Sequence, residues 1–133
     1  MKKVLSIVLC AFLALFIVGC GGGSSEPAQE EKTYQSILDE YTQKLQEAAP
    51  RLAEEYNAEY PNCGGDINQM AKLSNDKVGE LAEINNDGIS EMADIMTKNG
   101  DDYETYEEWA GKLMDVYMEC AGQITDAYMN SAM

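Results

Sequence analysis

Residues 33–60 read TYQSILDEYTQKLQEAAPRLAEEYNAEY, and the spacing of apolar and aromatic side chains in this stretch decides the fold. These side chains recur at steps of three or four residues: Tyr34, Leu38, Tyr41, Leu45, Ala48, Leu52, Tyr56 and Tyr60. Such steps place all of them on one helical face. Proline disrupts helical hydrogen bonding, yet the stripe keeps its phase across Pro50. The stretch therefore predicts one kinked helix over residues 33–59.

A second helix is predicted after a turn at residues 62–65 (NCGG). Asp66 followed by Gln69 has the pattern of a capping box, which satisfies free N–H groups where a helix begins. Apolar residues then recur at helical spacing: Ile67, Met70, Leu73 or Ser74, Val78, Leu81, Ile84, Ile89, Met92, Ile95 and Met96. Residues 85–88 (NNDG) interrupt this run with strong helix breakers. Gly100, shortly after Lys98, is expected to cap the end.

A third helix is predicted to start at Asp102 or at Thr105, where Thr105 and Glu108 form a second capping-box pattern. Its stripe contains Trp109, Ala110, Leu113, Tyr117, Cys120, Ile124 and Tyr128. Strands of alternating pattern do not appear in the sequence. We therefore expect an all-α, up-and-down bundle of three long helices, or of four if the chain breaks at residues 85–88.

The N-terminal residues have the features of an export signal. Two lysines precede an apolar run over residues 4–18 that Ser6 alone interrupts. At 1.5 Å per residue this run spans about 22 Å, which is short of a hydrocarbon core roughly 30 Å thick. A signal peptide is therefore expected rather than a permanent transmembrane helix.

The residues that follow this run, Ile17-Val18-Gly19-Cys20, resemble the lipobox of bacterial lipoproteins. The resemblance covers residues 1–20 and implies that Cys20 receives a diacylglyceryl group and that signal peptidase II cuts after Gly19. The mature protein would then be held on the extracytoplasmic face of the cell membrane by lipid, including palmitate, on Cys20. Two acyl chains are enough for stable anchoring. No specific family is recognised for the helical domain.

Three segments follow from these features. Residues 1–19 are the predicted signal peptide, residues 20–32 are the lipidated cysteine with a flexible tether rich in glycine, serine and acids, and residues 33–133 are one acidic helical domain. The glycine and serine run after Cys20 resembles small surface lipoproteins of Gram-positive bacteria, although the same pattern is compatible with a Gram-negative envelope.

The charge of the chain excludes several classes of function. It has 24 acidic and nine basic residues, and two of the nine lie in the predicted signal, so seven remain and the mature chain carries a formal charge of −17. Nucleic acid is excluded as a partner because phosphate binding needs clustered Lys and Arg. The chain contains no histidine, the usual general base near neutral pH. We expect a protein that is not an enzyme and that needs no cofactor.

One segment has a spacing typical of calcium loops. With Gly88 at the sixth position of a loop of the EF-hand or dockerin type, the ligand positions fall on Glu83, Asn85, Asp87, Glu91 and Asp94. The match is imperfect at both ends, because glutamate begins the loop and aspartate closes it. The alternative interpretation is a helix break with ordinary Asn-Asp-Gly turn chemistry.

The cysteines that remain after processing are Cys63 and Cys120, and an extracytoplasmic location permits a disulfide between them. The alternative is a free thiol at Cys120 packed as a small apolar residue in the core. The bridge is incompatible with a straight helix over residues 66–99, which would leave the two sulfurs some 20 Å apart. A bridged protein would have to bend sharply near residues 85–88.

Two hypotheses for the function remain. The first is a non-catalytic surface module that binds an extracellular protein, a peptide or a wall component. The second is a carrier of cations such as calcium, or of a small ligand, at the cell surface. The many tyrosines and methionines fit a partner surface in the first hypothesis, but they also fit an ordinary helical core.

Overall fold

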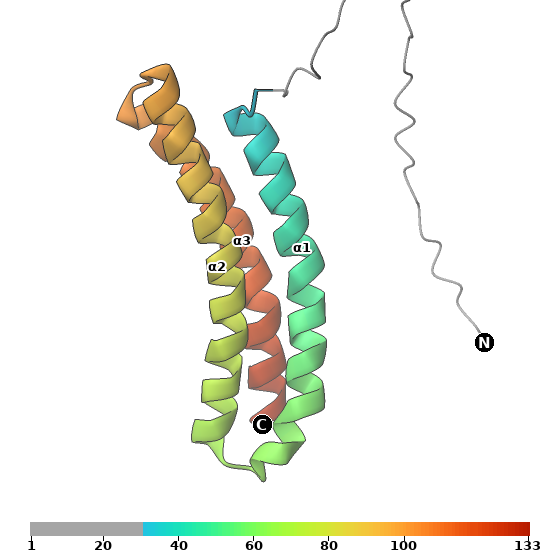
Figure 1. The fold of residues 1–133 in the computed structure, drawn as a ribbon. Coiled ribbons are helices and arrows are strands. Elements are labelled where there is room, and N and C mark those ends of the chain that lie inside the picture. Colours follow the sequence, from blue (N-terminus) through green and yellow to red (C-terminus); the bar gives the residue numbers. More distant parts are fainter. Residues whose placement is uncertain (1–30) are drawn as a thin grey trace, which may run out of the picture. The chain divides into compact units, whose positions relative to one another are not determined.

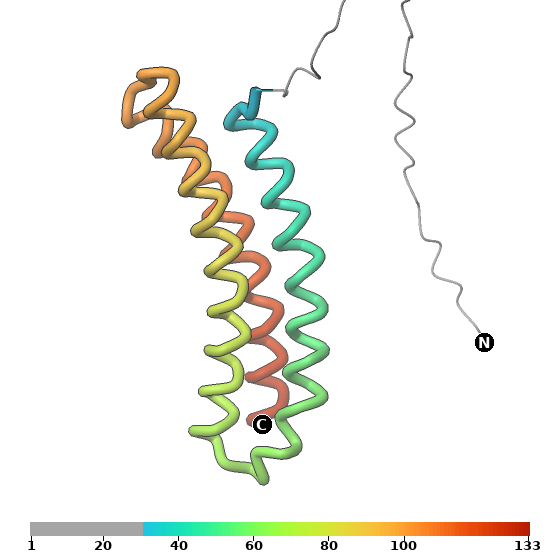
Figure 2. The backbone as a smooth tube through the Cα atoms, viewed as in Figure 1, coloured from blue at the N-terminus to red at the C-terminus, as the bar shows by residue number. Residues whose placement is uncertain are grey.

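The computed structural model describes residues 31–133, which form one compact unit of three long helices (Figure 1). Helix α1 spans Tyr34–Glu59, the short 3₁₀ helix η1 spans Tyr60–Cys63, α2 spans Ile67–Asn99 and α3 spans Tyr103–Ser131. Each long helix packs against the other two, which confirms the predicted all-α up-and-down bundle. The C-terminus lies beside the turn between α1 and α2 (Figure 2).

The first helix has the predicted boundaries. Thr33 caps it, because its hydroxyl accepts a hydrogen bond from the Ser36 backbone N–H at 3.1 Å while the Ser36 hydroxyl accepts one from the Thr33 N–H at 2.9 Å. Pro50 lies inside this helix, where its side chain is exposed. Six of the eight predicted stripe residues are buried, whereas Leu38 and Tyr60 are only half-buried. Ile37 and Ala49, which were not predicted on the stripe, complete the buried set: Tyr34, Ile37, Tyr41, Leu45, Ala48, Ala49, Leu52 and Tyr56.

The second helix is continuous through residues 85–88, as the three-helix prediction requires. Two of these residues, Asn85 and Gly88, belong to its buried stripe, which is formed by Met70, Ser74, Lys77, Leu81, Asn85, Gly88, Met92 and Ile95. Gly88 is a contact point between helices rather than a turn, since a Cβ atom on it would lie 2.6 Å from Leu113 Cδ2 and 2.8 Å from Tyr41 Cγ. The four-helix alternative is therefore wrong. Ile67, predicted on the apolar face, is more than half exposed.

The ends of α2 and α3 show how the turns are built. Asp66 caps α2 by accepting hydrogen bonds from the backbone N–H groups of Asn68 and Gln69, and Gly100 ends it in the left-handed conformation with φ 70°. The third helix begins at Tyr103 with Asp102 as N-cap, so the proposed start at Thr105 is wrong.

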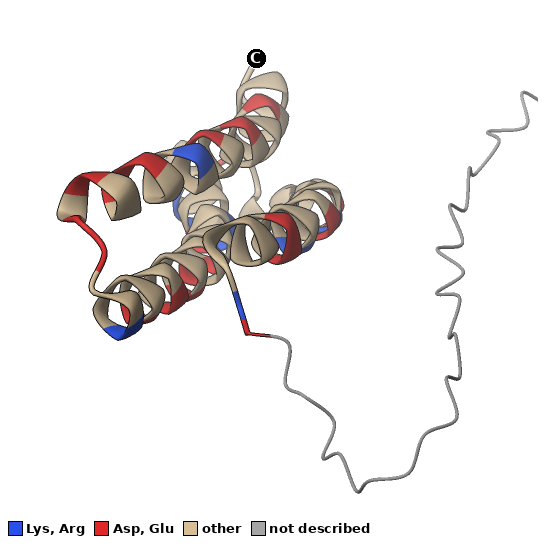
Figure 3. Ribbon diagram, turned by 90° about the horizontal axis from the view of Figure 1, so that it is seen from above, with Lys and Arg blue, Asp and Glu red and all other residues tan. Residues whose placement is uncertain are grey.

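The core of residues 31–133 lies along the common axis of the three helices, and all three contribute buried side chains to it. The buried residues that helix α3 contributes are Leu113, Cys120 and Ile124. Among the described residues, no helix has the apolar length needed to cross a bilayer. Acidic positions lie along all three helices and basic ones are few (Figure 3).

Candidate functional site

The residues predicted to carry the lipid anchor, Cys20 and the lipobox before it, lie outside the described residues. Four places in the described unit were candidates for chemistry or binding: an open hollow beside η1, a charged cluster at each end of the bundle, and the outward face of α3.

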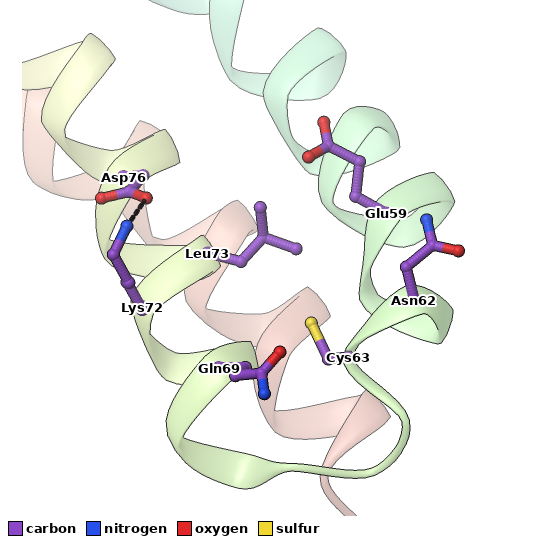
Figure 4. Close-up of a pocket in the computed structure, with 7 residues that line it drawn as sticks. All are labelled: Glu59, Asn62, Cys63, Gln69, Lys72, Leu73 and Asp76. Atoms are coloured by element: carbon purple, nitrogen blue, oxygen red, sulfur yellow. Dashed lines mark hydrogen bonds and ion pairs between the residues drawn. The ribbon is translucent and has the colours of Figure 1, made fainter.

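The hollow lies at the end of the bundle where η1 leads into α2 (Figure 4). It holds roughly 330 Å³ and is lined by Glu59, Asn62, Cys63, Gln69, Lys72, Leu73 and Asp76. The Lys72 ammonium donates a hydrogen bond to the Asp76 carboxylate at 2.7 Å, so this cation is already neutralised. The Cys63 thiol lies between η1 and α2 with no imidazole in the chain to activate it. The hollow can admit a small polar molecule but shows no arrangement for catalysis.

A nearly buried lysine lies between α1 and α2. The Lys77 ammonium donates to Glu59 at 2.9 Å and to Glu55 at 3.0 Å, and its side chain is 11% exposed. The hydrogen bond to Glu59 is the main reason why the pKa of Lys77 is raised, and the bond from Lys77 lowers the pKa of Glu55. This cluster fixes α2 to α1 and leaves no free charge for a ligand.

A second charged cluster lies at the opposite end, where the chain enters the bundle. The Lys32 ammonium lies 2.6 Å from Glu91 Oε2, and the Tyr41 hydroxyl donates to Glu91 Oε1 at 2.8 Å. The hydrogen bond from Lys32 is the largest cause of the lowered pKa of Glu91, while burial raises the pKa of Tyr41. Lys98 also pairs with Glu31 at 3.0 Å. These bonds hold the residues just before α1 against α2.

The structure does not bring the calcium candidates together as a loop. All five residues, Glu83, Asn85, Asp87, Glu91 and Asp94, lie within α2. Asn85 is directed into the core with 2% exposure, and Glu91 is already bonded to Lys32 and Tyr41. Within residues 31–133 no group of three acids or cysteines is placed to hold a metal ion. The physical reason is that Gly88 serves helix packing, so the backbone never makes the turn that a calcium loop requires.

The predicted disulfide is not formed, and both Cys63 and Cys120 are free. A hydrogen bond of 2.7 Å between the hydroxyls of Tyr56 and Ser131 places the end of α3 level with the end of α1. Cys120 lies 11 residues before Ser131, about 16 Å along the helix at 1.5 Å per residue. The continuous α2 thus keeps the thiols apart, as expected for an unbroken helix. Burial raises the pKa of Cys120, which packs in the core.

The outward side of α3 carries a row of uncharged residues that we call the methionine face, defined as Gly111, Met114, Met118, Gly122, Thr125 and Met129; all are exposed except Gly122, which is half-buried. Met118 is 65% exposed and Met129 is 56% exposed. These residues recur at steps of three or four, which places them on one side of the helix, opposite the buried Leu113 and Cys120. The apolar periodicity of the sequence predicted the inward face of α3 but did not predict the methionine face.

No family model matches the chain, and neither does a curated protein or a solved structure.

Proposed function

We propose that this chain is a lipoprotein anchored on the extracytoplasmic face of the cell membrane, and that its helical unit is a non-catalytic interaction module. The observation that carries the proposal is Cys20 placed directly after Ile17-Val18-Gly19 at the end of a short apolar run with a basic start. A thiol in this position is the group that receives the diacylglyceryl anchor in the lipoproteins that it resembles.

The topology of the bundle supports a display role. The tether joins the helical unit at Thr33, beside the Lys32–Glu91 pair, and the turn at η1 lies at the far end of α1. With 26 residues at 1.5 Å per residue, α1 is about 39 Å long. An anchor on Cys20 would therefore hold one end of the bundle by the membrane and present the long sides of the helices. The large negative charge repels anionic head groups, so the bundle would stand away from the lipid surface.

The side chains support binding rather than catalysis. Within each of the two end clusters, the charged residues are bonded to one another. The hollow beside η1 contains a thiol without a neighbouring base. The methionine face of α3 is not occupied by such bonds, and exposed apolar surface of this kind is typical of protein interaction sites.

The test is to replace Cys20 by alanine in the native host and to follow radiolabelled palmitate and membrane fractionation. Cys20→Ala should abolish the label and either release the protein or leave uncleaved precursor, because the anchor depends on this thiol. Cys10→Ala is the matched control, since Cys10 lies in the predicted signal peptide and its loss should leave the label unchanged. Undiminished labelling of Cys20→Ala would end the proposal.

A further inference from the structure

The methionine face is an uncharged strip on a strongly acidic protein. It runs from Gly111 to Met129, and its six members include no charged side chain. Beside it runs an acidic edge at steps of seven, four and seven residues, formed by Glu108, Asp115, Glu119 and Asp126. Of these acids, Glu108 is paired with Lys112 at 3.0 Å, while the other three have no ion pair within residues 31–133. Lys112, the one basic residue of α3, also lies 3.9 Å from the centre of the Trp109 ring.

Two glycines on this face have no role in the packing of the bundle. A Cβ atom on Gly111 or on Gly122 would meet no atom within 4 Å, and both residues have ordinary helical backbone. Glycine inside a helix costs about 1 kcal/mol relative to alanine. Gly122 provides a low surface between Met118 and Met129, and Gly111 provides one at the start of the face, so another backbone can approach closely at both places. Methionine suits such a surface because its flexible, polarisable side chain adapts to different partners.

We propose that the methionine face binds a cationic amphipathic helix, with the apolar side of that helix on the methionines and its basic side chains along Asp115, Glu119 and Asp126. Helices of this kind bind in apolar grooves through residues at helical spacing. The inference deepens the proposed function, because an interaction module on the cell exterior would present this face to extracellular peptides. Complementary charge favours this occupant, since an uncharged strip beside three unpaired acids attracts a partner with apolar and basic sides.

Charge also argues against a second copy of this chain as the occupant. The chain has a formal net charge of −15, and pairing two methionine faces would bring two acidic edges into one interface. Like charges placed together in this way weaken association. The face spans the 19 residues from Gly111 to Met129, about 27 Å for 18 steps of 1.5 Å, so one helix of about 18 residues covers it.

The binding test uses residues 31–133, whose core closes on itself, with circular dichroism to confirm folding. The probe is a fluorescent peptide of about 18 residues with leucines on one helical face and lysines on the other. A scrambled peptide of identical composition is the control, because it keeps the charge and loses the apolar side. We expect the amphipathic peptide to bind at least about tenfold more tightly than the scrambled one, a difference of about 1.4 kcal/mol. Equal binding of the two peptides would overturn the proposal.

Substitutions on the protein locate the binding surface. The double variant Met118→Ser/Met129→Ser should lose affinity for the amphipathic peptide by at least about tenfold, because it removes two exposed apolar contacts. Ile67→Ser is the matched control: Ile67 is 58% exposed at the start of α2, and its loss should leave affinity unchanged. Because all three side chains are exposed, the variants should melt close to the wild-type temperature. Unchanged affinity in the double variant would refute the assignment of the face.

Two further measurements locate the bound peptide and test whether a second copy of the chain occupies the face instead. With isotope-labelled methionine methyl groups, the peptide should shift the NMR signals of Met114, Met118 and Met129 and leave those of the buried Met70 and Met92 in place. A unit that is dimeric without peptide, and that Met118→Ser converts to a monomer, would overturn the proposal in favour of self-association. Loss of anchoring is tested separately at Cys20, so a failure of peptide binding and a failure of the lipoprotein proposal can be told apart.

Discussion

Replacing Gly88 by alanine tests the feature that the sequence left most open, the continuity of α2 through residues 85–88. The structure places the missing Cβ of Gly88 at 2.6 Å from Leu113 Cδ2 and at 2.8 Å from Tyr41 Cγ. Carbon atoms pack at about 3.5 to 4.0 Å, so both neighbours would have to move. Tyr41 has little freedom, since Cγ is the root of its ring and its hydroxyl is bonded to Glu91 at 2.8 Å. Leu113 is fully buried.

The magnitude follows from two opposing terms. Alanine is better than glycine inside a helix by about 1 kcal/mol, and an extra methyl group in a tight core costs about 1 to 3 kcal/mol. Both contacts are far below normal packing distance, so we take the upper end of that cost. Gly88→Ala should therefore lower the free energy of unfolding by about 2 kcal/mol. For a domain of about 100 residues this corresponds to a melting temperature lower by roughly 8 to 16 °C.

The assay is urea unfolding followed by circular dichroism, with Gly79→Ala as the matched control. Gly79 lies in the same helix, and a Cβ on it would meet no atom within 4 Å, so this substitution should stabilise the fold by about 1 kcal/mol. The two variants should thus change stability in opposite directions with the same m-value. In a Leu113→Ala background the cost of Gly88→Ala should shrink, because one of the two close neighbours is gone. If Gly88→Ala stabilised the protein as much as Gly79→Ala does, Gly88 could not lie between α1 and α3.

Leu113→Ala should lower the free energy of unfolding by about 2 to 5 kcal/mol, because Leu113 is fully buried, whereas Met114→Ala on the outward side should change it by less than about 0.5 kcal/mol. Equal effects at these neighbouring positions would show that the face is misassigned. Glu91→Gln should lower the melting temperature at neutral pH, because the Lys32 hydrogen bond lowers the pKa of Glu91 and so stabilises the folded state above the unfolded pKa of about 4.3. The deficit against wild type should shrink as the pH falls below the unfolded pKa of about 4.3 and vanish below the lowered pKa of the folded state. Glu54→Gln, at an exposed acid without an ion pair in residues 31–133, should show no such trend. A deficit independent of pH would contradict the role given to the ionised carboxylate.

The fold could be predicted because each helix repeats apolar side chains with little ambiguity. The stripe from Tyr34 to Tyr56 fixed α1 in phase and length, and Gly100 marked the end of α2. Leu113, Cys120 and Ile124 were all placed on the inward face of α3. Three amphipathic helices joined by short turns have few ways to bury their stripes other than a bundle.

The polar and small residues on the buried face of α2 could not be predicted from apolar periodicity. Lys77, Asn85 and Gly88 lie on the stripe at helical spacing, but their residue types are typical of surfaces and turns. Lys77 is buried because Glu55 and Glu59 neutralise it from α1, and Gly88 because two large side chains occupy the space above it. The residues that explain this burial lie on other helices. In the sequence of α2 itself, the only indication was that the positions of these residues continue the helical spacing of three and four.

The methionines show most clearly what composition alone leaves open. Met70 and Met92 are buried in α2, while Met118 and Met129 are exposed on α3, although the residue type is the same. The difference comes from the phase of each helix, because Met118 lies on the side of α3 away from Cys120. A buried core and an exposed apolar face are therefore built from the same residue type in the same chain. The position of each methionine relative to the buried stripe of its helix decides whether its side chain packs in the core or stays exposed to solvent.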